Sequence, residues 1–378
     1  MSASNDSQND ADRLEDLRER MRRLDLVLIA NAAERIELAR RIGETKRRQN
    51  LPTVDYAQER AVLERARDAA RERGLEPTVA EELLARLIRA SVSAQDEDRL
   101  RVGGLGAGKT AVLVGGAGRM GRWMARFLSA QGYTTGALDP AAPPEENAWA
   151  THALSEADLV VFATPPSVTA LFYREWATRP PKGVITDLAS IKGPLLEPIR
   201  ALAKAGGRVA SLHPMFGPSI VLLRDADVVI CDTGDAEATR TVEDLFALTT
   251  ARLVRIPLED HDRIMADLLS LAHATAIAFA LALPESEHPV RSTTFQALES
   301  LAAAVTRESP DVYYEIQVDN AFSGLALLRL EAALKRLVSA VADRDAAQFR
   351  ALLEEGRRRT PDPAIPPAPH SGRSSVLP

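Results

Sequence analysis

The stretch AVLVGGAGRMGRWMARFLSAQGYTTGALDP, residues 111–140, decides the fold of the central part of this chain. Its apolar start predicts a buried strand, which the pattern G-x-G-x-x-G follows at Gly116, Gly118 and Gly121. The first glycine is expected to turn the backbone out of the strand, the second to let a pyrophosphate approach, and the third to let helix and strand pack closely. A helical pattern and a second strand ending at Asp139 follow. The stretch therefore predicts a dinucleotide-binding unit rather than a glycine-rich turn without a ligand.

The cofactor is expected at the N-terminus of this helix, where free backbone N–H groups and the helix dipole hold phosphates. Asp139 lies about 20 residues beyond the glycines, where a carboxylate accepts hydrogen bonds from an adenosine ribose and repels a 2′-phosphate, so NAD is favoured over NADP. Pro165 stands in the Pro-Pro turn after the next apolar run. The predicted cofactor-binding residues are Gly116, Gly118, Arg119, Met120, Gly121, Asp139 and Pro165.

Composition limits the classes of protein to consider. A chain of 378 residues is long enough for two or three domains. The net charge of −6 argues against nucleic-acid or anionic-membrane partners. A single cysteine, Cys231, excludes an internal disulfide and a cysteine-based metal site and fits a reducing cytoplasm. The polar N-terminus has no signal-peptide core, no apolar run reaches membrane-spanning length, and we expect no metal.

Helical and strand patterns divide the chain into three folded parts: an all-α three-helix domain, a Rossmann-like α/β domain with a mostly parallel sheet, and an all-α domain. The predicted boundaries are a disordered lead at 1–11, the three helices at 12–95, a linker at 96–110, the dinucleotide domain at 111–258, the second helical domain at 259–360 and a disordered tail at 361–378.

The linker also contains a literal P-loop pattern, Gly103-x-x-x-x-Gly108-Lys109-Thr110. A P-loop needs a strand before it and a helix after it. Here polar residues precede the pattern and a predicted strand follows it, so we reject the match.

Cations on the first predicted helix suggest an anion site. Arg35 and Lys46 are 11 residues apart, so they share a face roughly 16 Å apart along the axis and can converge on one small anion. Arg18 lies about 25 Å before Arg35 on the same helix and can join that site only from a second subunit. Polar pairs at i, i+4 stand on the other two helices, at Asp55/Glu59 and Ser91/Gln95. The alternative is a solvated amphipathic bundle.

Residues 12–95 resemble the all-helical chorismate mutases through the segments LEDLRERMRRLD, AAERIELARRIGETK, LPTVDYAQER and ASVSAQ. The resemblance implies an intertwined homodimer with two active sites for chorismate, and it assigns roles to the polar residues. The substrate carboxylates would be bound by Arg35 and by Arg18 of the other chain, the ether oxygen by Lys46 and Gln95, and the hydroxyl by Glu59 and the backbone near Asp55, with Ser91 assisting. One departure is Gln58, where the family usually has an arginine, so one positive charge is missing.

Residues 110–358 resemble the prephenate dehydrogenase family through VGGAGRMG, DLASIKGP and LHPMFGP. The order of the two halves resembles the bifunctional T-protein family, in which the product of the first reaction is the substrate of the second. The resemblance implies rearrangement of chorismate to prephenate, followed by NAD-dependent oxidative decarboxylation to 4-hydroxyphenylpyruvate, in tyrosine biosynthesis.

His213 lies in a loop at the carboxyl end of a predicted strand, where ligands of such sheets bind, and a histidine there is a credible general base. The resemblance assigns it the proton of the ring hydroxyl. Ser190 would orient His213 or contact the nicotinamide, Lys192 would lie near the same pocket, and His273 would lie near the substrate. His261, like the remaining histidines, receives only a structural interpretation.

A second departure concerns the substrate carboxylates of prephenate. The family binds them with arginines on a helix of the second all-α domain, where this chain has Gln296 and Ala304. Arg291 and Arg307 are close in sequence, and Arg307 is our candidate for the missing contact. Two alternatives stay open: the same reactions on the 4-amino analogues of chorismate and prephenate, and a degenerate regulatory protein that binds an aromatic acid.

Overall fold

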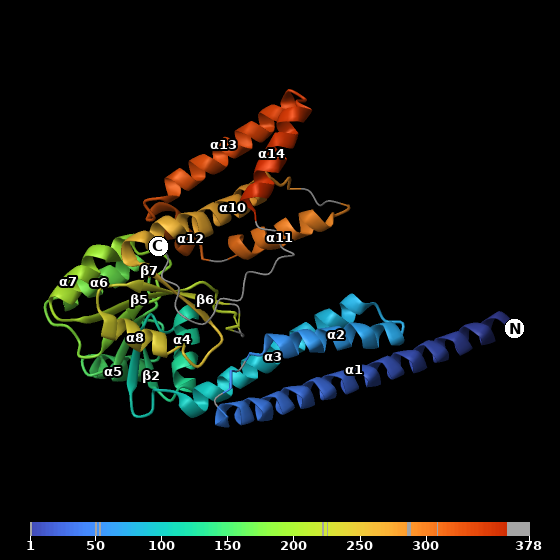
Figure 1. Ribbon diagram of the computed structural model, residues 1–378, viewed down its shortest axis with the longest axis horizontal. Coiled ribbons are helices and arrows are strands. Elements are labelled where there is room, and N and C mark those ends of the chain that lie inside the picture. Colours follow the sequence, from blue (N-terminus) through green and yellow to red (C-terminus); the bar gives the residue numbers. More distant parts are fainter. Residues whose placement is uncertain are drawn as a thin grey trace.

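The structure is a computed structural model that describes residues 2–49, 51–52, 54–220, 223–224, 226–285, 289–307 and 309–360, with side chains from residue 13 onward. It has three parts: an N-terminal group of helices, a sheet with helices on both faces, and a C-terminal group of helices (Figure 1). The predicted tail at 361–378 lies outside the described residues.

The N-terminal part consists of α1 (Ser2–Arg48), α2 (Tyr56–Glu72) and α3 (Pro77–Gly103). Asp55 caps α2 by accepting a 3.0 Å hydrogen bond from the backbone N–H of Gln58, and Gly74 follows its last turn with a positive φ of 68°. Pro77 starts α3 at a position where its missing N–H costs nothing. The first half of α1 extends beyond the other two helices (Figure 1).

Two predicted boundaries of this part are wrong. Residues 2–11, predicted to be a disordered lead, belong to α1, because no proline or glycine interrupts propagation of the helix. The predicted linker at 96–110 is mostly helix, since α3 continues to Gly103 through charged residues that are good helix formers. Its Asp96 and Leu100 are buried against the sheet-containing part, which stabilises the extension.

The glycines after α3 serve close packing. A Cβ atom on Gly104 would collide with the backbone of Gln131, and one on Gly106 would collide with Tyr133. A helix precedes this segment and a strand follows it, which is the reverse of a P-loop, so rejection of that motif is confirmed.

The sheet has seven strands in the order β2-β1-β3-β4-β5-β6-β7, all neighbours parallel except the antiparallel pair β5–β6. The strands are β1 (Thr110–Val114), β2 (Thr134–Leu138), β3 (Leu159–Phe162), β4 (Val184–Asp187), β5 (Arg208–Pro214), β6 (Asp227–Asp232) and β7 (Arg252–Pro257). The helices between them are α4 (Arg119–Ala130), α5 (Pro144–Ala153), α6 (Pro166–Trp176), α7 (Leu196–Lys204) and α8 (Ala236–Asp244). The predicted Rossmann-like architecture is confirmed.

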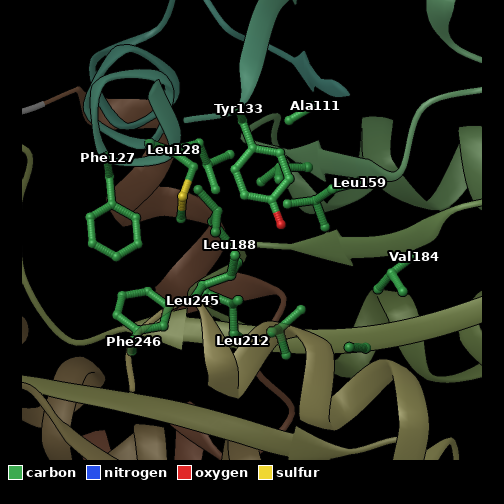
Figure 2. Close-up of a cluster of buried hydrophobic side chains, with 14 of the residues drawn as sticks. Ala111, Phe127, Leu128, Tyr133, Leu159, Val184, Leu188, Leu212, Leu245 and Phe246 are labelled. Carbon is green, nitrogen blue, oxygen red and sulfur yellow. The ribbon is translucent and has the colours of Figure 1, made fainter. Parts of the chain in front are cut away.

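Apolar side chains fill both faces of the sheet, as a parallel sheet requires. Figure 2 shows one of these cores, in which Phe127 of α4 lies near Phe246, and Leu212 of β5 lies near Leu245. The rings of Phe127 and Phe246 stack with their centroids 4.9 Å apart. Leu100 of α3 joins this core, so the N-terminal helices share it.

The C-terminal part contains helices alone among its described residues: α9 (His261–Met265), a π-helical turn (Ala266–Leu271), α10 (Ala272–Ala282), α11 (Thr293–Thr306), α12 (Pro310–Val318), α13 (Ser323–Ala342) and α14 (Ala346–Arg359). The helical run of residues 310–342 is broken after Val318. Asn320 explains the break, because its side chain accepts from the backbone N–H of Phe322 and donates 2.8 Å to the carbonyl of Asp262.

One helical segment of the described chain, Leu258–Ala282, is long and apolar enough to cross a membrane, which contradicts the prediction that no such run exists. Length and composition alone are weak evidence, because apolar helices in the cores of globular proteins pass the same test. The segment packs against α11 and α13 and begins with the buried polar residues His261 and Asp262.

Candidate active sites

The glycine turn after β1 has the shape of a dinucleotide site, with one reassignment. The residue with a positive φ is Gly115, at 81°, so it turns the chain out of the strand in place of Gly116. Gly116 instead packs against Ala137 of β2, where a Cβ would collide. Gly121 lies against the backbone of Gly115 and Gly116, the close helix approach that its position predicts.

The first turn of α4 leaves room for a phosphate. Gly118 is the exposed N-cap, and a Cβ built there meets only the carbonyl of Gly115, at 3.1 Å. Asp139, at the end of β2, accepts 3.1 Å from the N–H of Ala117 and 2.8 Å from the N–H of Ala141. The carboxylate of Asp139 is thus held next to the glycine turn, an arrangement that fits a site for NAD. The other predicted cofactor residues, Arg119, Met120 and Pro165, lie at the starts of α4 and α6.

The carboxyl ends of β1, β3, β4 and β5 share one edge of the sheet. The parallel register aligns Val114 with Phe162, Phe162 with Asp187 and Asp187 with Ser211. His213 follows two residues later, three strand spacings from the glycine turn, or about 14 Å. His213 therefore lies at the ligand-binding edge, but inside β5 and not in the loop that the sequence predicted.

His213 belongs to a buried chain of three polar groups that joins β5 to α9. Its Nδ1 lies 3.0 Å from Nε2 of His261, and Nδ1 of His261 lies 2.7 Å from Oδ1 of Asp262. Asp262 also accepts 2.6 Å hydrogen bonds from the backbone N–H groups of Lys192 and Gly193. From the sequence, His261 received only a structural interpretation, and its contact with His213 was not indicated. Its signal in the sequence was an adjacent His-Asp pair directly after the last strand.

Charges and hydrogen bonds determine which atoms carry protons in the hydrogen-bonded series Asp262–His261–His213. Burial raises the pKa of Asp262, but hydrogen bonds from His261, Lys192 and Gly193 outweigh burial and lower the pKa below its usual value. The ionised carboxylate accepts the Nδ1 proton of His261, so Nε2 of His261 accepts the Nδ1 proton of His213. Burial, with the nearby His261 and Lys192, lowers the pKa of His213 well below its usual value. His213 is therefore neutral, with its Nε2 lone pair available as a base.

Lys192 and Ser190 both follow β4, and Lys192 makes contacts there that the sequence did not indicate. The side chain of Lys192 is fully buried, with its Nζ 2.5 Å from Asp187 and 3.0 Å from the carbonyl of Leu212. It therefore ties β4 to β5 beneath His213, and it does not reach toward a substrate. Ser190 lies half-buried in the loop after β4. The group that hydrogen-bonds to His213 is His261, and not Ser190.

The remaining predicted residues of this half lie in the C-terminal helices. His273 is half-buried at the start of α10, its ring packs edge-on against Tyr313 with 4.5 Å between centroids, and its Nδ1 is buried without a hydrogen-bond partner. Arg307 is the exposed C-cap of α11, and Gln296 and Ala304 are exposed on the same helix.

The N-terminal helices bring three predicted mutase residues into one layer. Arg35 donates 2.7 Å to Oγ of Ser91 and 3.0 Å to the carbonyl of Leu87. Gln95, one turn beyond Ser91, donates 2.7 Å to the carbonyl of Ala39, and its Oε1 is buried without a partner. A Cβ on Gly43 would lie 2.8 Å from Cγ of Gln95, so this glycine lets the amide approach α1.

Other predicted mutase residues lie around this layer. Lys46 is half-buried on α1, one turn beyond Gly43. The side chain of Asp55 is occupied by capping α2, and Gln58 is exposed. Arg18 is exposed on the extended half of α1 and lies 3.8 Å from Glu15, so it does not reach Arg35 within its own chain.

Glu59 has a partner that the sequence did not indicate. Both of its carboxylate oxygens accept from Arg224, at 2.8 and 2.6 Å, across the boundary between the N-terminal helices and the sheet-containing part. Asp96 crosses the same boundary by accepting 2.9 and 2.6 Å hydrogen bonds from the backbone N–H and hydroxyl of Thr250. The first half of the chain is thus bonded directly to the second.

In the part of the chain that the structure describes, no group of three His, Cys, Asp or Glu side chains is placed to hold a metal ion.

Comparisons with known proteins agree with both halves. Residues 17–96 match the family model of type II chorismate mutases, and residues 141–255 match that of the nucleotide-binding domain of prephenate dehydrogenase. A T-protein of Enterobacter agglomerans is 30% identical over 320 residues, 83% of each chain. A 4-amino-4-deoxyprephenate dehydrogenase of Streptomyces pristinaespiralis is 31% identical over 270 residues, 65% of this chain and 89% of that one.

Among solved structures, prephenate dehydrogenase from A. aeolicus, in complex with hydroxyphenyl propionate and NAD+, aligns with a TM-score of 0.53 at 17% identity, covering 66% of this chain and 96% of that one. At that identity the alignment supports the fold of the second half. The two family models and the T-protein relative span both halves in the same order. The chain belongs to the T-protein family of NAD-dependent bifunctional chorismate mutase/prephenate dehydrogenases.

Proposed function

We propose that His213 is the general base of the dehydrogenase and that the Arg35 layer is the chorismate site of the mutase. The observation that carries the first assignment is the Asp262–His261–His213 chain, which leaves one lone pair on a buried, neutral imidazole. The observation that carries the second is the convergence of Arg35, Ser91 and Gln95 from two helices.

In the dehydrogenase, Nε2 of His213 accepts the proton of the substrate's ring hydroxyl. NAD supplies the hydride acceptor when it is bound at the glycine turn. As the hydroxyl carbon becomes a carbonyl, His261 and Asp262 stabilise the imidazolium that forms on His213, because the ionised carboxylate lies one ring away. Loss of carbon dioxide then returns an electron pair to the ring, and the ring oxygen takes the proton back as the hydroxyl of the product. The buried Lys192–Asp187 pair holds β4 and β5 in register beneath the reacting groups.

The mutase reaction needs no acid, base or nucleophile. It needs a compact substrate conformer and charge stabilisation at the ether oxygen, where a bond breaks. In our proposal Arg35 and Arg18 of a second chain bind the carboxylates, Lys46 and Gln95 donate to the ether oxygen, Glu59 accepts from the hydroxyl, and Ser91 holds Arg35 in place.

We further propose that the protein is a homodimer. A row of apolar residues on the extended half of α1 is exposed, including Leu17, Met21, Leu24 and Leu28, each at least 51% exposed. A monomer rarely leaves so continuous an apolar face in water. A second copy of α1 would cover it and bring its Arg18 to the Arg35 layer. A reduced, buried Cys231 is consistent with a cytoplasmic protein.

A second candidate substrate pair is 4-amino-4-deoxychorismate and 4-amino-4-deoxyprephenate. The Streptomyces pristinaespiralis relative favours it, together with the replacements at Gln58, Gln296 and Ala304. NADH formation should be measured from chorismate, from prephenate and from the two amino analogues. We expect the higher kcat/KM with chorismate and prephenate, and higher values with the amino analogues would contradict the proposal.

The pH profile of the dehydrogenase follows from the lowered pKa of His213. The base form must be present, and burial keeps it present to lower pH, so kcat/KM for prephenate should fall only as the pH drops well below 6.5. Initial rates with NAD across pH 5 to 8 test this. Samples held at each pH and assayed at neutral pH control for inactivation, and an acid limb centred at or above 6.5 would contradict the assignment.

A further inference from the structure

Arg224 connects the two halves at the mutase layer. It belongs to the segment between β5 and β6, which begins just after His213. Its guanidinium makes a two-pronged ion pair with Glu59, and both side chains are largely buried, with 12% and 19% of their surface exposed. The pair therefore lies in a protected environment, unlike the surface ion pairs of this protein, which contribute little.

The register of α2 and α3 places Glu59 beside the other mutase residues. These helices run antiparallel, and Arg67 of α2 pairs with Glu81 of α3. From that pair, Glu59 lies about 12 Å back along α2 and Ser91 about 15 Å forward along α3, so they reach nearly the same level. Arg224 thus reaches the layer that contains Arg35.

Further contacts hold Arg224 at this level. Its guanidinium carbon lies 5.9 Å from the ring centroid of Tyr56, the first residue of α2. Its charge also acts on Asp96, the residue of α3 that bonds to Thr250. Arg224 is surrounded by groups from α2 and α3, although it comes from the dehydrogenase half.

The ion pair with Arg224 leaves the carboxylate of Glu59 able to accept a hydrogen bond from a substrate. A planar guanidinium that donates to both oxygens fixes the plane of a carboxylate. Each carboxylate oxygen has about two lone pairs, so each can accept one more hydrogen bond, for example from a substrate hydroxyl. A lysine could supply the charge but could not fix the plane.

We propose that Arg224, supplied by the dehydrogenase half, is a positioning residue of the mutase site that orients Glu59 toward the hydroxyl of the substrate. This rests on the proposed role of Glu59 in the mutase. It follows that the N-terminal helices alone do not contain the whole mutase site.

The test compares Arg224→Gln with Arg252→Gln in the full-length protein. Arg252 also makes a two-pronged pair, with Asp227 at the start of β6, but this pair is more exposed and does not include Glu59. We expect Arg224→Gln to raise KM for chorismate about tenfold with kcat changed less than about threefold, because a contact made in both the ground and transition states is lost. Arg252→Gln should leave both constants within about twofold of wild type.

Arg224→Lys and the double variant Glu59→Gln/Arg224→Gln complete the test. The lysine variant keeps the charge and should recover only part of the affinity. In the Glu59→Gln background, Arg224→Gln should have no further effect, because Arg224 acts through Glu59. Thermal unfolding of each variant separates a loss of folding from a loss of binding.

An unchanged KM in Arg224→Gln, or an equal rise in the Glu59→Gln background, would overturn the proposal. Arg35→Ala serves as the reference for the mutase site itself. If Arg35→Ala loses mutase activity while Arg224→Gln does not, only the role of Arg224 fails. If Arg35→Ala keeps full activity, the proposed mutase site fails.

Discussion

Replacement of His213 by asparagine should lower kcat for oxidative decarboxylation of prephenate by about a thousandfold, within the range expected for a lost general base. The amide N–H of asparagine can replace Nδ1–H as donor to His261, so the buried network keeps a partner at that position. The amide has no basic lone pair where Nε2 stood, so the substrate proton has no acceptor. NADH formation from prephenate at saturating NAD measures the effect.

The matched control is His152→Asn on α5, outside the histidine chain, which should leave the dehydrogenase rate within about twofold of wild type. The chorismate mutase rate of the His213 variant should also be unchanged, because His213 is not among the residues of the proposed mutase site. A dehydrogenase kcat within tenfold of wild type in His213→Asn would show that another group takes the proton.

The sequence placed His213 near the ligand-binding edge of the sheet but did not indicate its partners. His213 is the next-to-last residue of β5, whose position depends on a local pattern, an apolar run followed by a polar loop. His261 lies 48 residues later, and its role depends on the docking of α9 against the end of β5. No periodic pattern in the nearby sequence indicates the contact between His213 and His261. A histidine next to an aspartate at a helix start is common in proteins without catalytic function.

The connection between the halves shows the same limit. The charged and glycine-rich composition of residues 96–110 predicted a linker, but helix propagation continues as long as side chains find partners. Asp96 accepts a hydrogen bond from Thr250, and Leu100 packs in the core of the sheet. Both sets of partners are far away in sequence. Arg224 is likewise one of many arginines in the sequence, and only the fold brings it to Glu59. The sequence predicted the turn at Gly116, where the G-x-G-x-x-G pattern begins. In the structure the adjacent Gly115 has the positive φ, so the predicted turn was one residue too late.

The second large effect concerns Arg35 and Arg18 together. Arg35→Ala removes the cation that bonds to Ser91 and Leu87 and should lower mutase kcat/KM at least about a hundredfold, as expected for a lost charged contact to a carboxylate. Arg18→Ala should have a comparable effect, although Arg18 is exposed in one chain and lies far along α1. Both variants should still form NADH from prephenate and lose NADH formation from chorismate.

Mixing the two variants tests whether the site is shared between chains. In a hybrid dimer of one Arg18→Ala chain and one Arg35→Ala chain, one site receives Arg35 from the first chain and Arg18 from the second, so it is intact, while the other site lacks both. Random assembly gives hybrids in half of the dimers, so co-expressed variants should recover about a quarter of the wild-type mutase activity.

The control is the double variant Arg18→Ala/Arg35→Ala co-expressed with Arg35→Ala, which contains no intact site in any combination. Recovery in the first mixture and none in the second requires that Arg18 act across the subunit boundary. If neither mixture recovers activity while each variant remains folded and dimeric, Arg18 does not complete a site across the subunit boundary, and the exposed apolar face of α1 must be covered in another way.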